Sequence, residues 1–398
     1  MPMVMATVMA TSAAMPVDAQ DYRFDGSISE PVLRNYLARA MTTGELLTVR
    51  GDFDDNLRML KNTGVKFAGR SIILWGSEGA FPQVLPVAKR NAEKIHQAIP
   101  EMILEACVLE IVSRAVDQVA VPNWVFKAFG LPVEERNFRY ADMIYLSGMG
   151  RDQWGKDASV PDISRTETQL WFYCQAASYI GIGAEAIHFG QIEIMHANDP
   201  EYEHWRKVLT RVRKYAAQNA RRHFVLCNAH APGGGPVDSQ GLLLDFHEFP
   251  LRIAEGTDHP EQGVLRVGYI DSFYGRSKGG LTPSGWRCEH LPYLVELDNW
   301  GSSDKPGQPN IGGCWIWGYD EICWFARQPE PYRNDWLRYA WKWVRENDPA
   351  GYVEMPGCRC LANPVDGKPF YFANTPSRAT PDGFGQEATI RDIWANDR

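Results

Sequence analysis

The segment 186–193 reads Ala-Ile-His-Phe-Gly-Gln-Ile-Glu, an apolar run that ends in an amide and a carboxylate. This pattern predicts a buried strand with Gln191 and Glu193 at its end. Residues two apart on a strand point to the same side, so the two polar groups share a face. Asp199 and Pro200 then predict a helix start. A strand with a polar end, followed by a helix, is the unit from which (β/α) enzyme sites are built.

Paired carboxylates are the machinery of glycoside hydrolysis: one protonates the leaving oxygen, and the other attacks the anomeric carbon or activates water. Glu193 is the candidate acid/base, because the neighbouring Ile192 and Ile194 can raise the pKa of its carboxyl group by desolvation. Its partner is expected among the carboxylates of the later strands, which are Asp271, Asp320, Glu321 and, if 293–297 is a strand, Glu296. The alternative for each of these residues is a structural role as an ion-pair partner, helix cap or loop-orienting group.

Polar and aromatic side chains at the other predicted strand ends are candidates for substrate binding, because aromatic faces suit sugar rings and the strand ends of a parallel barrel share one face. These candidates are Arg50, Asp52, Trp75, Glu110, Gln191, Asn228, His230, Tyr269, Tyr274, Arg276 and Trp317. The alternative for many of the aromatic residues is a place in a large core.

From about residue 44, short apolar runs alternate with helical patterns, which favours parallel strands joined by helices. Eight strands are predicted, at 46–50, 71–75, 102–108, 186–193, 223–227, 264–271, 314–319 and 370–374. The fold class expected is therefore α/β, a (β/α)8 TIM barrel, with a doubly wound sheet as the alternative. A long loop at 113–164 follows the third strand, and an extra hairpin strand at 241–247 follows the fifth. The segment 284–300 is interpreted as a helix, with a strand at 293–297 as the alternative.

The chain has 398 residues and a net charge of 41 − 49 = −8. Binding to a phosphate backbone needs clustered Lys and Arg, so this charge argues against a nucleic-acid partner. The 14 tryptophans suit a carbohydrate or oligosaccharide substrate. The eight cysteines include no CxxC pair, which argues against a zinc ribbon or a disulfide framework. The oligomeric state is left open.

Residues 1–20 are rich in Met and Ala and contain no Lys or Arg. A secretory signal needs a basic start, so we expect a disordered leader, followed by a single barrel domain over 21–398. No run is long and apolar enough to span a membrane. A cytoplasmic protein is therefore expected, and export through a degenerate signal peptide is the alternative.

Three functions remain open on this fold. The first is a glycosidase that needs no metal or cofactor. The second is a metal-dependent sugar isomerase, epimerase or lyase, with Glu193, His230 and Asp271 as ligands of a divalent ion. The chain has only nine histidines, which weakens this second reading. The third is a non-catalytic carbohydrate-binding barrel.

The Gln191-Ile192-Glu193 segment and the late Trp315-Ile316-Trp317 segment, together with the alternating strands, resemble the (β/α)8 glycoside hydrolases. In the large retaining superfamily of that fold, the acid/base lies at the end of strand four and the nucleophile at the end of strand seven. The resemblance implies that Glu193 is the acid/base. It places the nucleophile at Asp320 or Glu321, or at Glu296 in the other register of the late strands.

One position departs from that superfamily, because Ile192 stands where an Asn usually precedes the acid/base. The segments 22–33 and 188–193 also resemble an uncharacterised group of bacterial proteins over the whole chain.

Overall fold

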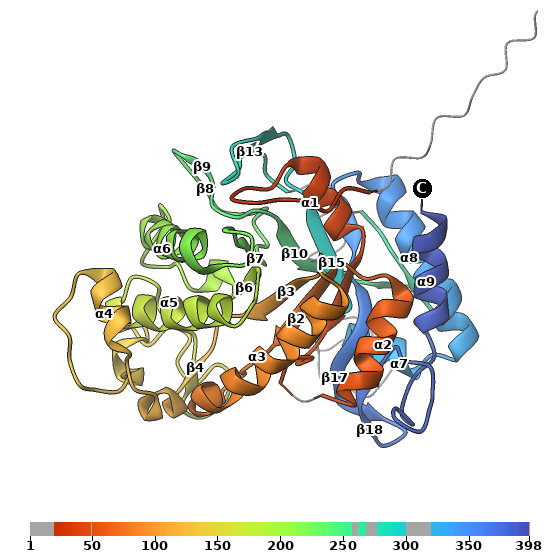
Figure 1. Ribbon diagram of the computed structural model, residues 1–398, viewed down its shortest axis with the longest axis horizontal. Coiled ribbons are helices and arrows are strands. Elements are labelled where there is room, and N and C mark those ends of the chain that lie inside the picture. Colours follow the sequence, from red (N-terminus) through yellow and green to blue (C-terminus); the bar gives the residue numbers. More distant parts are fainter. Residues whose placement is uncertain (1–19, 49, 257–261, 268–276, 300–319, 398) are drawn as a thin grey trace, which may run out of the picture.

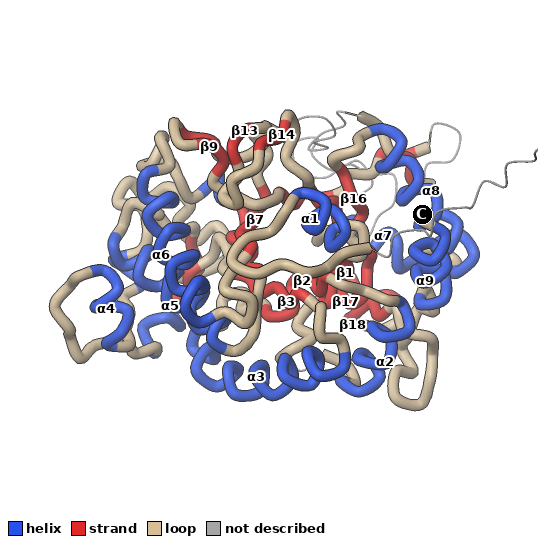
Figure 2. Tube along the Cα trace, turned by 45° about the horizontal axis from the view of Figure 1, so that its top comes forward, coloured by secondary structure: helices blue, strands red, loops and turns tan. Residues whose placement is uncertain are grey.

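The computed structural model describes residues 20–48, 50–256, 262–267, 277–299 and 320–397. Parallel strands form its centre and helices cover the outside, as Figures 1 and 2 show. The parallel strands are β1 (Ala40–Thr43), β2 (Phe67–Ile72), β3 (Ile103–Cys107), β6 (Ala186–Gln191), β7 (Leu226–His230), β10 (His247–Pro250), β15 (Tyr293–Glu296) and β16 (Gly351–Val353). Each strand pairs with the next in chain order, which is the topology of an α/β barrel.

The eighth strand joins the two edges of this sheet. Its first part, β16, pairs in parallel with β15. The chain then runs through Glu354 directly into β17 (Met355–Val365), whose first residues pair in parallel with β1. One continuous segment therefore bonds to both the seventh and the first strand. The last strand, β18 (Lys368–Phe372), pairs antiparallel with β17 and lies outside the ring.

Eight helices of the described residues are amphipathic or buried elements around this ring. They are α1 (Glu30–Leu37), α2 (Phe53–Thr63), α3 (Phe81–Ala98), α5 (Thr166–Gly181), α6 (Glu203–Asn219), α7 (Glu321–Arg327), α8 (Glu330–Asn347) and α9 (Glu387–Asn396). Helix α6, for example, buries Trp205, Val208 and Val212 on one stripe. None of the helices in the described ranges combines the length and apolar character that a membrane crossing needs.

A long insertion separates β3 from α5, as the sequence predicts. It carries the short strands β4 (Val112–Ser113) and β5 (Ala158–Ser159), three-residue and five-residue 3-10 turns, and α4 (Asn123–Phe129). Helix α4 ends at Gly130, whose φ of 67° suits a glycine C-cap. The insertion stands out at the left of Figure 1 beside α5.

The predicted hairpin after the fifth strand is also present, as β8 (Val237–Asp238) and β9 (Gly241–Leu242). Of the predicted hairpin segment, only its last residue, His247, belongs to β10, which is the true sixth strand. In the described residues, no helix links β7 to β10 or β10 to β15. Short antiparallel pairs occupy the second link: β11 (Ala254–Glu255) with β12 (Gly263–Val264), and β13 (Gly280–Leu281) with β14 (Arg287–Cys288).

Several predicted strands are therefore corrected. The apolar residues at 46–48 lie in a turn, because Leu46 and Leu47 reach the core without strand pairing. The predicted sixth strand at 264–271 begins in the antiparallel β12, and its end lies outside the described residues. The predicted eighth strand at 370–374 is the antiparallel β18.

The segment 284–300, interpreted as a helix, contains the seventh strand, β15. All four of its residues are buried, so neither a helical nor an alternating pattern is visible in the sequence. The predicted seventh strand at 314–319 lies outside the described residues.

Candidate functional site

A cavity of about 590 Å³ opens among the carboxyl ends of the barrel strands. Its polar lining includes Arg70 within β2, Glu110 after β3, Gln191 at the end of β6, His230 at the end of β7 and Asp298 after β15. This is the face on which parallel barrels carry their sites. Five of the residues predicted to bind substrate line it: Arg50, Trp75, Glu110, Gln191 and His230.

Glu110 is held in the cavity by the end of the neighbouring strand. Its Oε2 accepts a hydrogen bond from the backbone N of Gln191 at 3.0 Å, and its Oε1 accepts one from Nε2 of Gln191 at 2.7 Å. Gly190 makes this approach possible, because a Cβ at Gly190 would lie 2.1 Å from Oε2 of Glu110. No ion pair to Glu110 is found in the described part of the chain, so its carboxyl group faces neutral donors.

Asp298 lines the same cavity two residues beyond the end of β15. Its Oδ1 accepts from the backbone N of Asn299 at 2.7 Å and forms an ion pair with Arg359. Burial and the adjacent Glu296 act to raise the pKa of Asp298, but the guanidinium of Arg359 opposes them, and the pKa is lowered overall. Asp298 is therefore a carboxylate at neutral pH, with a side chain that remains 15% exposed.

Glu296 lies directly beneath the cavity floor, at the end of the seventh strand. Its Oε2 accepts from Nε of Arg70 and from Nη1 of Arg359, both at 3.0 Å, and its Oε1 lies 3.2 Å from Nε2 of His230. Burial acts to raise the pKa of Glu296, but Arg359 and Arg70 lower it well below its ordinary value. Its side chain is 1% exposed, so its partners rather than Glu296 itself face the cavity.

His188, on β6, also lines the cavity. Its Nδ1 lies 2.7 Å from Oδ1 of Asn228, and Nδ2 of Asn228 donates to Oε1 of Glu105 at 2.6 Å. Because the amide oxygen only accepts, this bond places the imidazole proton on Nδ1 and leaves a lone pair on Nε2. The Nε2 atom has no hydrogen-bond partner in the described residues. Asn228, a predicted substrate-binding residue, thus lies behind His188 rather than in the cavity lining.

Glu193 lies elsewhere, in a 3-10 turn (Ile192–Ile194) after β6. Both of its carboxylate oxygens accept from the backbone N of Gly233, at 2.9 and 2.8 Å. Burial raises the pKa of this carboxyl group, as the sequence suggested, but the side chain is not part of the cavity lining. The carboxylate of Glu193 therefore binds the loop that follows β7.

Three other predicted carboxylates have structural contacts. Asp52 accepts from the backbone N of Asp55 as the N-cap of α2, and Asp320 accepts from the backbone N of Cys323 as the N-cap of α7. Glu321 pairs with Arg252 and accepts from the backbone N of Asp298 at 2.9 Å, so it supports the cavity from behind. The remaining predicted site residues, Asp271, Tyr269, Tyr274, Arg276 and Trp317, lie outside the described residues.

Two groups of side chains in the described residues have the spacing of metal ligands. They are His188, His230 and Glu248, and His230, Glu296 and Asp298. The ligand set expected from the sequence was Glu193, His230 and Asp271. His230 belongs to both groups, whereas the carboxylate of Glu193 bonds to Gly233 and Asp271 lies outside the described residues.

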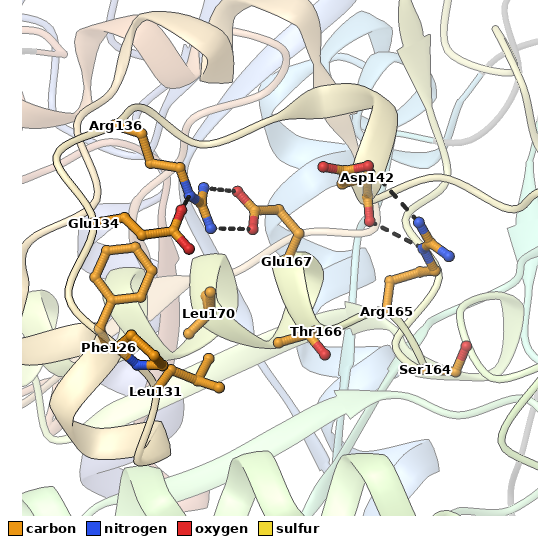
Figure 3. Close-up of a pocket in the computed structure, with 11 residues that line it drawn as sticks. Phe126, Leu131, Glu134, Arg136, Asp142, Ser164, Arg165, Thr166, Glu167 and Leu170 are labelled. Atoms are coloured by element: carbon orange, nitrogen blue, oxygen red, sulfur yellow. Dashed lines mark hydrogen bonds and ion pairs between the residues drawn. The ribbon is translucent and has the colours of Figure 1, made fainter.

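A second cavity, of about 490 Å³, lies on the insertion beside α5 (Figure 3). Arg136 forms a two-bond ion pair with Glu167, at 2.6 and 2.9 Å, and Arg165 lies 3.9 Å from Asp142. Phe126, Leu131 and Leu170 add apolar side chains to the lining. The residues that line this cavity belong to α4, the loop after it and the start of α5 rather than to the barrel strand ends.

No family model and no curated protein matches the chain. Among solved structures, it is similar to an alpha-galactosidase from Thermus thermophilus, with 15% identity and a TM-score of 0.34 over 52% of this chain and 40% of that chain. It is similar to the alpha-galactosidase from Lactobacillus brevis, with 11% identity and a TM-score of 0.40 over 90% of this chain and 40% of that chain. A family 18 chitinase from Cycas revoluta, in complex with (GlcNAc)3, has 11% identity and a TM-score of 0.40 over 86% and 93%.

These similar structures are glycoside hydrolases, and the chain spans 40% of the length of the two alpha-galactosidases. The function proposed below rests on the residues of the cavity itself.

Several site residues were not singled out from the sequence, chiefly Arg70, Glu248, Asp298 and Arg359. The run Tyr-Leu-Val-Glu-Leu-Asp at 293–298 carried the missed signal, because it is an apolar strand followed by two carboxylates of equal parity. Because this segment is interpreted from the sequence as a helix, Asp298 is not recognised as a residue at a strand end.

Proposed function

We propose that the protein is a glycoside hydrolase that uses Glu110 as the general acid and Asp298 as the second carboxylate. The observation that carries this proposal is that both side chains line one cavity in opposite electrostatic surroundings. Glu110 faces neutral N–H groups, whereas Asp298 faces the guanidinium of Arg359. Pairs of titratable groups with contrasting environments are typical of acid and base assignments in enzymes.

We assign the acid role to Glu110 because its carboxyl group bonds to neutral donors of Gln191 and no ion pair to it is found among the described residues. A proton on this carboxyl group would be given to the glycosidic oxygen as the bond to the leaving group breaks. The acid role expected for Glu193 therefore passes to Glu110 in this proposal.

Asp298 suits the complementary role because Arg359 keeps it charged. It would either attack the anomeric carbon or accept a proton from the attacking water. Glu296 holds Arg70 and Arg359 in place from below, so we assign it a positioning role rather than a direct contact with substrate.

Trp75 supplies an apolar face for the sugar ring. It lines the cavity, is 46% exposed, and packs edge-on against Trp154 with ring centroids 5.2 Å apart. Nε1 of Trp154 donates to the backbone oxygen of Glu110 at 3.0 Å, which ties this aromatic pair to the proposed acid. An exposed aromatic ring beside carboxylates is a suitable arrangement for a sugar substrate.

A panel of aryl-glycosides and oligosaccharides tests the proposal. We expect hydrolysis of at least one sugar by the wild type, in the presence and absence of chelator. Asp298→Asn should lower kcat by a factor of about 10³ or more, since a carboxylate of this kind supplies several kcal/mol of transition-state stabilisation.

Glu193→Gln is the matched control, because it removes a carboxylate next to the same strand but outside the cavity lining. It should retain activity within about tenfold of the wild type. An inactive Glu193→Gln variant together with an active Asp298→Asn variant would reverse the assignment, and a folded wild type inactive on every glycoside would contradict the function.

A further inference from the structure

We propose that His188, His230 and Glu248 form a binding site for one divalent transition-metal ion beneath the cavity. This proposal does not rest on the proposed hydrolase function, and it departs from the expectation of a site without metal. Two imidazoles and one carboxylate are a recurrent ligand set for zinc and iron(II).

The three side chains come from adjacent strands of the barrel, β6, β7 and β10. One potential ligand atom from each lies within 4.8 Å of the others. Metal–ligand bonds of about 2.1 Å separate neighbouring ligand atoms by about 3–4 Å, so the group needs to contract by about an ångström. His188 and His230 also line the cavity, which gives an ion and a further ligand a route from solvent.

Two of the potential ligand atoms have no other partner in the described residues. Nε2 of His188 and Oε1 of Glu248 are buried and make no hydrogen bond in the described residues, whereas Nδ1 of His188 lies 2.9 Å from Oε2 of Glu248. Burying a polar atom without a partner is costly, so such atoms call for an explanation. A metal ion bonded to both would satisfy them together.

The surroundings of His188 match those of a metal-bound histidine. Such a histidine usually donates its second ring N–H to a carbonyl or carboxylate, which fixes the tautomer and ring orientation. Nδ1 of His188 lies 2.7 Å from Oδ1 of Asn228, and Asn228 is in turn held by Glu105. The lone pair on Nε2 is therefore available to an ion.

Carboxyl groups also outnumber guanidinium groups around the proposed site. Four buried carboxyl groups of the described residues gather in the barrel interior, and only two buried guanidinium groups accompany them. The carboxyl groups are Glu105, Glu248, Glu296 and Glu354, and the guanidinium groups are Arg70 and Arg359. Both guanidinium groups bond to Glu296, whereas the ion-pair contacts of Glu248 among the described residues are the longer 3.5 Å contact with Arg70 and a 2.9 Å contact with His188.

Arg70 contacts two of the three proposed ligands. Its Nη2 lies 3.0 Å from Nε2 of His230 and 3.5 Å from Oε2 of Glu248. An ion bound to His230 replaces the first of these contacts, while Nε of Arg70 keeps its 3.0 Å bond to Glu296. The other ligand-spaced group, around Glu296 and Asp298, is already occupied by Arg70 and Arg359 and is the weaker candidate.

Titration of the untagged, chelator-treated full chain with Zn²⁺ and Co²⁺ by calorimetry tests the site. We expect one ion per chain and a visible absorption band for bound Co²⁺, with no comparable binding of Ca²⁺, which prefers oxygen ligands. His188→Gln and Glu248→Gln should each abolish this binding. Asn228→Ala should weaken it by roughly 10–100-fold, as loss of a group that orients a metal ligand does.

His247→Gln is the matched control, because His247 is a buried histidine next in sequence to Glu248 whose Nδ1 bonds to Ser277 at 2.7 Å. It should leave binding within about twofold of the wild type. The wild type also supplies a test that needs no variant: spin-echo spectra of the Cu²⁺-loaded protein should show coupling to two imidazoles. Absence of saturable binding, absence of imidazole coupling, or binding that His188→Gln leaves intact would each overturn the proposal.

Discussion

Glu110 and Glu193 have the same carboxyl side chain, but different hydrogen-bond partners place them in different surroundings. Both are glutamates beside the fourth strand, and both accept backbone hydrogen bonds. Gly190 brings Glu110 into the cavity, whereas the turn after β6 directs Glu193 to the backbone of Gly233. The sequence identified both residues as polar groups near strand ends, but the partner of each depends on contacts 40 or more residues away.

Trp75 provides a test at the level of one side chain. Trp75→Ala should raise KM for the preferred glycoside about fivefold and change kcat little, because a stacking contact of about 1 kcal/mol binds substrate and transition state alike. Steady-state kinetics measure both constants. The exposed Trp124, which lies on the insertion away from the cavity, is the control, and Trp124→Ala should leave KM unchanged. A kcat effect alone would contradict the stacking role of Trp75.

The strand β6 shows how one element sets the geometry of the site. The sequence predicts this strand correctly to within a few residues, because its apolar run is long and is followed by a clear helix start. The same reasoning fails for β15 and β10. Strand β15 is buried on both faces and has no diagnostic period. Strand β10 reads His-Glu-Phe-Pro and buries polar residues on both sides, because Glu248 contacts His188 and His247 bonds to Ser277.

Gly190 tests the contact between β6 and the proposed acid. Its φ is 48°, and a Cβ there would lie 2.1 Å from Oε2 of Glu110, so Gly190→Ala should displace that carboxylate. We expect activity to fall at least tenfold, with a loss of about 1–2 kcal/mol in unfolding free energy. Activity assays and urea denaturation measure the two effects.

Gly181→Ala is the control for this substitution. Gly181 ends α5, and its Cβ would meet only Oη of Tyr215 at an ordinary 3.4 Å. It should change activity less than twofold. Equal losses in the two variants would show that Gly190 has no special role in holding Glu110.

At the scale of the whole molecule, the sequence predicts the barrel class and the insertion after the third strand, and the pairings confirm both. The fold class is predicted from the alternation of strands and helices along the whole chain, so it remains correct even when single strands are misassigned. The closure of the ring does not follow from the sequence, because the eighth strand bonds to two neighbours through different parts of one segment.

Buried acids at the start of α7 predict how stability depends on pH. Burial raises the pKa of Asp320 to about 6 and that of Glu321 to about 7, the latter against the opposing effect of Arg252. The folded state therefore binds these protons more tightly than the unfolded state. This contribution to stability is complete below the ordinary carboxyl pKa and is lost as pH rises through about 6 to 7.

Urea denaturation between pH 4.5 and 8 measures this dependence. We expect Glu321→Gln, which keeps the shape of the protonated acid, to lose less stability over this range than the wild type. The solvent-exposed Glu203→Gln is the control and should follow the wild-type slope. A Glu321→Gln variant with the full wild-type slope would contradict the assignment to Glu321.

The leaving-group dependence of Glu110→Gln tests the central claim most directly. A general acid is needed when the departing group is a poor one, such as an alkyl alcohol or a second sugar, and hardly at all when it is a dinitrophenolate. We predict that Glu110→Gln loses at least about 10³-fold in kcat/KM on the natural-type glycoside but less than about tenfold on the dinitrophenyl glycoside. Equal losses on both substrates, or full activity on both, would contradict Glu110 as the acid of this site.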